Sequence, residues 1–183
     1  MTGDDTVKPE KIEIIKRKEP LQVMGSQFYG DPFHSEGEWS VKNEIGLLWQ
    51  RFGSLLEKNR DAIDKIRLNK ETAYEIHIQP EDYKDTKKYY VFVGVEVKEF
   101  TEMPIEFVGK VFPTTMYAVF TFKGEEMFRG GDFIWQEWFR TSREYEEAYP
   151  YFIEVYNEKR FFGLDNKNSE VDYHIPVRLR EGD

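Results

Sequence analysis

The sequence contains no cysteine, which excludes disulfides, thiolate nucleophiles and cysteine-ligated zinc. It also has no long hydrophobic run. The first 20 residues lack the apolar segment of a signal peptide, and apolar runs such as Met116 to Phe120 are far shorter than the roughly 20 residues that span a bilayer. These absences predict a cytoplasmic protein that is neither exported nor inserted into a membrane.

Positive charge is also scarce. Lys and Arg number 26 against 35 Asp and Glu, so the formal net charge is −9. A negative field repels phosphate backbones, and we therefore expect no direct binding of nucleic acid. The three histidines, His34, His77 and His174, do not have metal-ligand spacing, and no glycine-rich phosphate loop is present. We expect neither a metal nor a cofactor.

Aromatic residues, in contrast, are abundant and make up 16% of the chain, with 4 Trp, 11 Tyr and 15 Phe. Many of these rings must pack in a core. A set this large also favours a pocket lined by aromatic side chains, the kind of site that holds flat or cationic organic molecules.

Hydrophobic periodicity predicts short strands around two helices. Three-four spacing of apolar residues indicates a helix over 43–66, capped by Ser40 or Asn43 and with a break near Asn59. A turn at Gly130-Gly131 and a cap at Asp132 precede a second helix. Strands are predicted at 11–16, 21–29, 74–78, 89–97, 110–122 (interrupted by Pro113), 151–157 and 170–177, with a linker at 99–107.

The order strand, helix, strand, strand therefore occurs twice. LLWQRF at 47–52 is similar to FIWQEW at 133–138, and Glu75-Ile76-His77 is similar to Glu154-Val155-Tyr156, at a comparable offset. We predict a single α+β domain over 1–183. It is a tandem βαββ repeat with pseudo-twofold symmetry, and its halves span about 11–98 and 108–178.

Seven segments together resemble one family, the GyrI-like or AraC-type effector-binding domains, which include multidrug-sensing modules of bacterial transcription regulators. The segments are VMGSQFYG at 23–30, LLWQRFG at 47–53, VFVGVEV at 91–97, MYAVFTFKG at 116–124, FIWQEWF at 133–139, and FIEVYNEKRF at 152–161 with SEVDYHIPV. The resemblance implies an antiparallel sheet with two helices and a ligand cleft between the halves. Two departures are a shorter loop between Gly124 and Asp132 and the lack of an upstream helix-turn-helix segment, which predicts a stand-alone binding domain.

Glu154 is the first candidate for the site. Strand alternation places Phe152, Glu154 and Tyr156 on one face, so a carboxylate lies among aromatic rings. Burying such a charge costs several kcal/mol unless it is paired, so the site should attract a cation or hold the glutamate protonated. In the family that this sequence resembles, the glutamate of this motif contacts cationic ligands. The alternative is an exposed glutamate on an edge strand.

The remaining candidates are aromatic walls of the cleft. Trp135 and Trp138 lie three residues apart on the second helix, and Trp138 matches the tryptophan that recurs in the family motif. Core packing is the alternative for both. Trp49 is expected in the core, and Glu75 is either a counterpart of Glu154 or a solvent-facing relic of the repeat. The predicted ligand-binding set is Glu154, Trp138, Trp135, Tyr156, Tyr117, Tyr29 and Tyr74.

The sequence therefore predicts a protein that binds small lipophilic or cationic aromatic compounds and is not an enzyme. Two alternatives remain open. One is a hydrolase of cyclopropane-containing electrophiles that uses Glu154 as acid or base, as the resemblance implies for some relatives. The other is an inhibitor of a protein partner, of the gyrase-inhibitor type.

Overall fold

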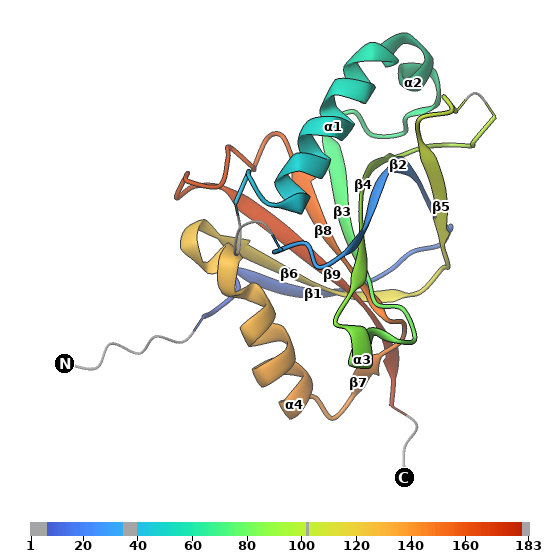
Figure 1. Ribbon diagram of the computed structural model, residues 1–183. Helices are drawn as coiled ribbons and strands as arrows, with labels where there is room; N and C mark the ends of the chain where they lie inside the picture. Colours follow the sequence, from blue (N-terminus) through green and yellow to red (C-terminus); the bar gives the residue numbers. More distant parts are fainter. Residues whose placement is uncertain (1–6, 35–39, 102, 181–183) are drawn as a thin grey trace.

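The structure is a computed structural model that describes residues 7–34, 40–101 and 103–180. Its centre is one antiparallel sheet with the strand order β1-β6-β9-β8-β3-β4-β2-β5, and β7 pairs with β9 (Figure 1). The predicted α+β fold with two βαββ units is confirmed. The strands are β1 Lys11–Lys16, β2 Leu21–Gly30, β3 Thr72–Ile78, β4 Tyr89–Glu96, β5 Val108–Phe112, β6 Met116–Lys123, β7 Tyr145–Glu147, β8 Tyr151–Asn157 and β9 Glu170–Leu179.

The strand order is symmetric about its middle. Read outward from the central β8–β3 pair, β9, β6 and β1 on one side correspond to β4, β2 and β5 on the other. The strand that precedes each unit pairs with the other unit, because β1 lies beside β6 and β5 lies beside β2. This exchange joins the two units through their outer strands as well as through β3 and β8.

The first helical region covers the β2–β4 side of the sheet. Helix α1 (Glu44–Lys58) begins at Asn43, whose side chain accepts a hydrogen bond from the Gly46 amide, as expected of an N-cap. It ends at Asn59, and α2 (Arg60–Ile66) follows, so the predicted break is confirmed. Between β3 and β4 the chain forms the short helix α3 (Tyr83–Thr86).

The second helical region begins earlier than predicted. A 3-10 segment η1 (Gly124–Arg129) leads into the π-helical segment η2 (Asp132–Trp138) and α4 (Phe139–Thr141). The predicted turn at Gly130-Gly131 is wrong, since both residues have right-handed helical backbone angles. A Cβ atom on Gly130 would lie 2.8 Å from the Phe122 ring, so this glycine lets the helix approach the sheet.

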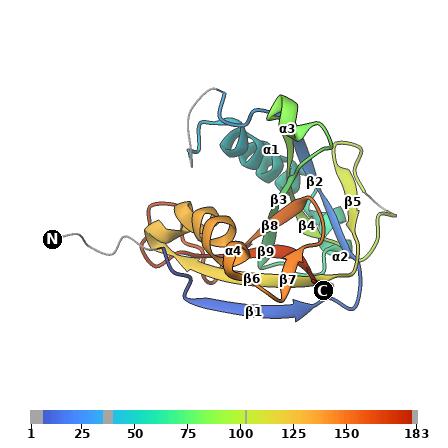
Figure 2. The same cartoon turned by 90° about the horizontal axis from the view of Figure 1, so that it is seen from below.

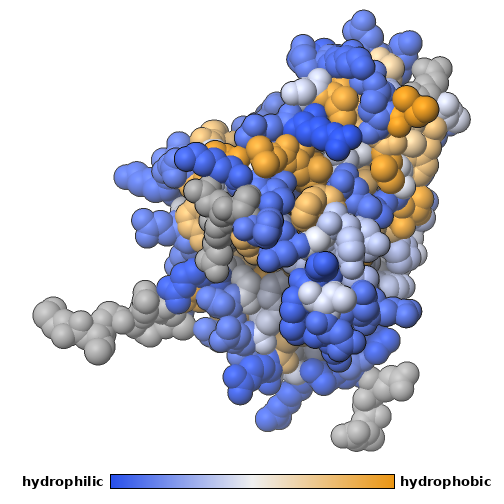
Figure 3. Space-filling model, viewed as in Figure 1, coloured by the Kyte–Doolittle hydropathy of each residue, from blue (hydrophilic) through white to orange (hydrophobic). Residues whose placement is uncertain are grey.

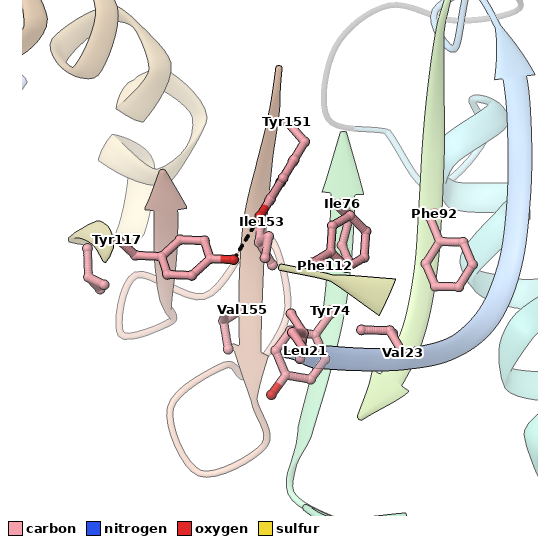
Figure 4. Packing of buried hydrophobic residues seen from close by; sticks show 11 residues of the cluster. Leu21, Val23, Tyr74, Ile76, Phe92, Phe112, Tyr117, Tyr151, Ile153 and Val155 are labelled. Atoms are coloured by element: carbon pink, nitrogen blue, oxygen red, sulfur yellow. Dashed lines mark hydrogen bonds between the residues drawn. The ribbon is translucent and has the colours of Figure 1, made fainter. Parts of the chain in front are cut away.

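Both faces of the sheet are covered by packed side chains. Figure 2 shows α1 and α4 on the same side of the central strands β3 and β8, and each helix packs on its own half of the sheet. On the opposite face, side chains of the curled sheet pack on one another. There the Tyr117 and Tyr151 hydroxyls are 2.9 Å apart and hydrogen-bonded (Figure 4). Among the described helices, none is long and apolar enough to cross a membrane.

Candidate functional site

A cavity of about 870 Å³ lies on the helical side of the sheet. Its walls include Trp49 from α1 and Trp135 from η2, and its floor is formed by β3 and β8. Val41, which also lines the cavity, is 59% exposed. The face drawn in Figure 3 is mainly hydrophilic, with apolar side chains gathered over α1 and over β5.

Two acidic residues lie in the middle of the cavity floor. The Cα atoms of Glu75 on β3 and Glu154 on β8 are partners in the antiparallel register. Both side chains point into the cavity, and the residues are only 4% and 3% exposed. Because alternate residues of a strand share a face, His77 lies on the same side of β3 as Glu75.

Each carboxylate is oriented by an aromatic donor. The Trp49 indole Nε1 donates to Glu75 Oε2 at 2.5 Å, and the Tyr156 hydroxyl donates to Glu154 Oε2 at 2.6 Å. The other two oxygens face one histidine: His77 Nε2 is 2.7 Å from Glu75 Oε1 and 3.9 Å from Glu154 Oε1. The two strands therefore present a pair of fixed carboxylates that share a single imidazole.

Burial shifts the proton affinities of this cluster. Burial, and next the charge of Glu75, raise the pKa of Glu154 to about 7, although His77 and the tyrosine hydrogen bonds act in the opposite direction. Burial by itself would lower the pKa of His77, but the hydrogen bond and charge of Glu75, with the charge of Glu154, raise it above its ordinary value. Protons and cations therefore compete for the cluster near neutral pH.

Aromatic rings surround the carboxylates. The Phe152 ring stacks on His77 with a centroid distance of 4.5 Å and an interplanar angle of 15°. Trp135 meets Phe152 edge-on at 5.1 Å, and Trp49 meets Tyr156 edge-on at 5.4 Å. The indole Nε1 of Trp135 donates to Glu147 Oε1 at 2.6 Å, which fixes the ring at the cavity wall. The site thus combines negative charge with flat apolar walls.

Three of the predicted site residues meet in this cavity, namely Glu154, Trp135 and Tyr156. The predicted placement of Phe152, Glu154 and Tyr156 on one strand face agrees with the structure. Trp49, which was expected in the core, lines the cavity and is held there by its hydrogen bond to Glu75. Glu75 itself is buried, so its interpretation as a solvent-facing relic is wrong.

The other four predicted residues lie outside the cavity. Tyr74 and Tyr117 are buried on the opposite face of the sheet, where the Tyr74 hydroxyl donates to Glu96 Oε2 at 3.1 Å. Tyr29 is 44% exposed and packs on Tyr90. Trp138 belongs to the core under the second helix, where it lies edge-on to Phe120 with a centroid distance of 5.1 Å.

His77 was not among the predicted site residues, and the structure places it in the cavity. It lacked the spacing of a metal ligand within its own segment, yet the fold brings its imidazole beside two carboxylates from two strands. The available signal was the period-two pattern Glu75-x-His77 beside the repeated Glu154. One ligand atom from each of Glu75, His77 and Glu154 lies within 4.8 Å of the others, and among the described residues this is the group whose donors could also hold a metal ion.

Comparison with known proteins identifies one family. Residues 14–177 match the family model Cass2, described as integron-associated effector binding protein. No curated protein sequence matches the chain.

Three similar solved structures share the fold. SAV2435 bound to tetraphenylphosphonium is 12% identical with a TM-score of 0.65, over 92% of this chain and 94% of that one. The integron cassette protein from the mobile metagenome of Vibrio cholerae is 18% identical with a TM-score of 0.59, over 93% and 98%. The EcmrR C-terminal domain is 15% identical with a TM-score of 0.63, over 92% and 97%.

Proposed function

Because the chain belongs to the Cass2 family of integron-associated effector-binding proteins, a GyrI-like effector-binding family, we propose that its cavity binds lipophilic organic cations. The observation that carries this proposal is the pair of buried carboxylates, Glu75 and Glu154, at the floor of an aromatic cavity. Among the described residues, their only ion-pair partner is His77. His77 supplies at most one positive charge for the two carboxylates, and a ligand can supply the second.

The energetics favour a cation over a neutral molecule. A buried carboxylate without a partner costs several kcal/mol, and a bound cation offsets this penalty in a desolvated site. The surrounding rings of Trp135 and Phe152 add apolar contact, and a cation over an aromatic face gains about 0.5–2 kcal/mol. The structural neighbour that was solved with tetraphenylphosphonium supports this class of ligand.

The test is a titration with tetraphenylphosphonium, followed by tryptophan fluorescence. Trp49 and Trp135 line the cavity, so binding should quench their emission saturably. Glu154→Gln should weaken binding by about 1–3 kcal/mol, because it removes a charged partner from a buried site. Glu158→Gln is the matched control, since it removes the same charge from an exposed residue and should leave the affinity unchanged.

Two results would contradict the proposal. One is an unchanged affinity in folded Glu154→Gln protein, which would remove this carboxylate from the site. The other is equal affinity for triphenylmethanol, an uncharged aryl compound, which would show that charge plays no part. We further propose a cytoplasmic binding protein without turnover, since a pair of oriented carboxylates is sufficient for binding and the cysteine-free sequence suits that compartment.

A further inference from the structure

The cavity floor holds two carboxylates in an arrangement that is more specific than general negative charge. Glu75 and Glu154 are directly opposite on neighbouring strands, and an aromatic donor engages one oxygen of each. The Tyr173 hydroxyl, which donates to the Met127 carbonyl, also lies against Glu154. The remaining oxygen of each glutamate, Oε1, faces the same point beside His77. A carboxylate only accepts, so in the empty site Nε2 donates to Glu75 Oε1. When a ligand takes over that contact and the imidazole carries its proton on Nδ1, Nε2 becomes an acceptor too, and one ligand atom of each of the three residues lies within 4.8 Å of the others.

Two carboxylate oxygens, joined by the imidazole nitrogen once its proton has moved to Nδ1, match one kind of donor. A protonated primary amine carries three N–H bonds on one small atom, and charge-assisted hydrogen bonds to carboxylates are short and strong. A quaternary ammonium or phosphonium ion has no N–H, and its substituents keep the charged atom away from the carboxylate oxygens. Such an ion can balance the negative charge of the site, but it cannot donate hydrogen bonds to the carboxylate oxygens.

The donors that hold the carboxylates strengthen this distinction. Because Trp49 and Tyr156 fix one oxygen of each glutamate, the two Oε1 atoms are oriented before any ligand arrives. A small ammonium group can replace the contact between His77 and Glu75 and bridge both strands. Phe152 and Trp135 then lie where an aromatic group attached to the amine would pack.

From this geometry we infer that the site is selective for aromatic ligands that bear a protonated primary amine, which donates hydrogen bonds to Glu75, Glu154 and His77 together. Glu75 is the residue that sets this selectivity, because a single carboxylate would serve a quaternary cation equally well. The inference rests on the proposed function and names its ligand class.

The test compares two cations that share one aromatic group, 2-(naphthalen-2-yl)ethylammonium and its N,N,N-trimethyl derivative. Calorimetric titrations at pH 8 keep both compounds charged, since alkyl ammonium groups titrate near pH 10. EDTA in the buffer keeps trace divalent metals off the carboxylates. The trimethyl compound has more apolar surface, so simple hydrophobic burial would make it the tighter ligand.

We expect the primary amine to bind wild-type protein at least about tenfold more tightly, which is about 1.4 kcal/mol. In Glu75→Gln this ratio should fall close to one, and in the control Glu158→Gln it should stay at the wild-type value. The wild-type comparison needs no variant, so it decides the matter even if Glu75→Gln fails to fold.

Each other result overturns a specific claim. Equal or tighter binding of the trimethyl compound overturns the inference and leaves the proposed binding of cations standing. A ratio that survives in folded Glu75→Gln removes Glu75 as its cause. If neither cation binds, both the inference and the proposed function fail.

Discussion

Glu75 and Glu154 are register partners in the central β3–β8 pair, so two acidic residues from separate halves of the sequence lie directly opposite each other. Like charges in this position destabilise a sheet, and here both are buried. The packed cores on either side of the sheet must supply the free energy that keeps the pair in place. A local loss of folding stability that the rest of the structure compensates is typical of binding sites.

The first prediction concerns pH. Burial and the neighbouring Glu75 raise the pKa of Glu154 to about 7, so below this pH a bound cation must displace a proton. The affinity for tetraphenylphosphonium, whose charge does not titrate, should therefore rise with pH by up to about tenfold per unit and level off above 7. Loss of the His77 proton, whose pKa is also raised, acts in the same direction.

Binding titrations between pH 5.5 and 8.5 measure this dependence. Glu154→Gln should make the curve shallower, because its side chain stays neutral throughout and only the His77 proton is still lost. An affinity of the wild-type protein that does not change over this range would show that no proton is displaced.

The second prediction concerns stability without ligand. A glutamate whose pKa rises from 4.5 to about 7 on folding is stabilising while it is protonated, and this contribution is lost as pH rises through 7. At pH 8 the ionised group lowers the free energy of unfolding by about 3 kcal/mol. Glu154→Gln should therefore be more stable than wild type at pH 8 and similar to it at pH 5.

Urea unfolding at the two pH values provides the measurement. Exposed Glu158→Gln should match wild type at both. A Glu154→Gln protein that is less stable than wild type at pH 8 would mean that the ionised carboxylate is well paired in the empty site.

The third prediction uses two glycines in helices. In Gly130→Ala the new Cβ would lie 2.8 Å from the Phe122 ring and 3.2 Å from that of Tyr173, and overpacking of this kind lowers stability by about 1–3 kcal/mol. In α1, a Cβ on Gly53 would meet nothing within 4 Å, so Gly53→Ala should raise stability by about 0.5–1 kcal/mol. Denaturant titrations of both variants test the close approach of the second helix, and a neutral Gly130→Ala would argue against it.

The fourth prediction separates two tryptophans. Trp135 lines the cavity, whereas Trp138 is packed against Phe120 and Tyr145. Trp135→Phe should weaken cation binding by about 1 kcal/mol and reduce the fluorescence quenching. Trp138→Phe should lower stability and leave the affinity of the folded protein unchanged. The reverse pattern in the two titrations would place the ligand on the other side of the helix.

Much of the fold followed from local patterns. The three-four spacing of apolar residues located α1 and its break, and β-rich segments located most of the strands. The short strand β7 was missed because three residues carry too little pattern to identify it. The helical start at Gly124 was also missed, since glycine pairs usually mark turns and here serve close packing.

For the site residues, too, local patterns predicted some positions and missed others. Trp135 and Trp138 lie three apart, which on an α-helix would make them neighbours. Instead they fall in a π-helical segment, whose i→i+5 hydrogen bonds widen the turn and separate the two rings. Tyr74 and Tyr117 lie on strands that were predicted, but on the face turned away from the cavity.

The sequence by itself determined the alternation that places Phe152, Glu154 and Tyr156 on one side of a strand, because side-chain direction in a strand depends only on residue parity. It could not determine which strand lies beside β8. That pairing joins segments from opposite halves of the chain, and their register depends on the packing of both helices and both cores. Only the tertiary structure therefore brought Glu75 and His77 against Glu154 and turned an isolated glutamate into a paired acidic site.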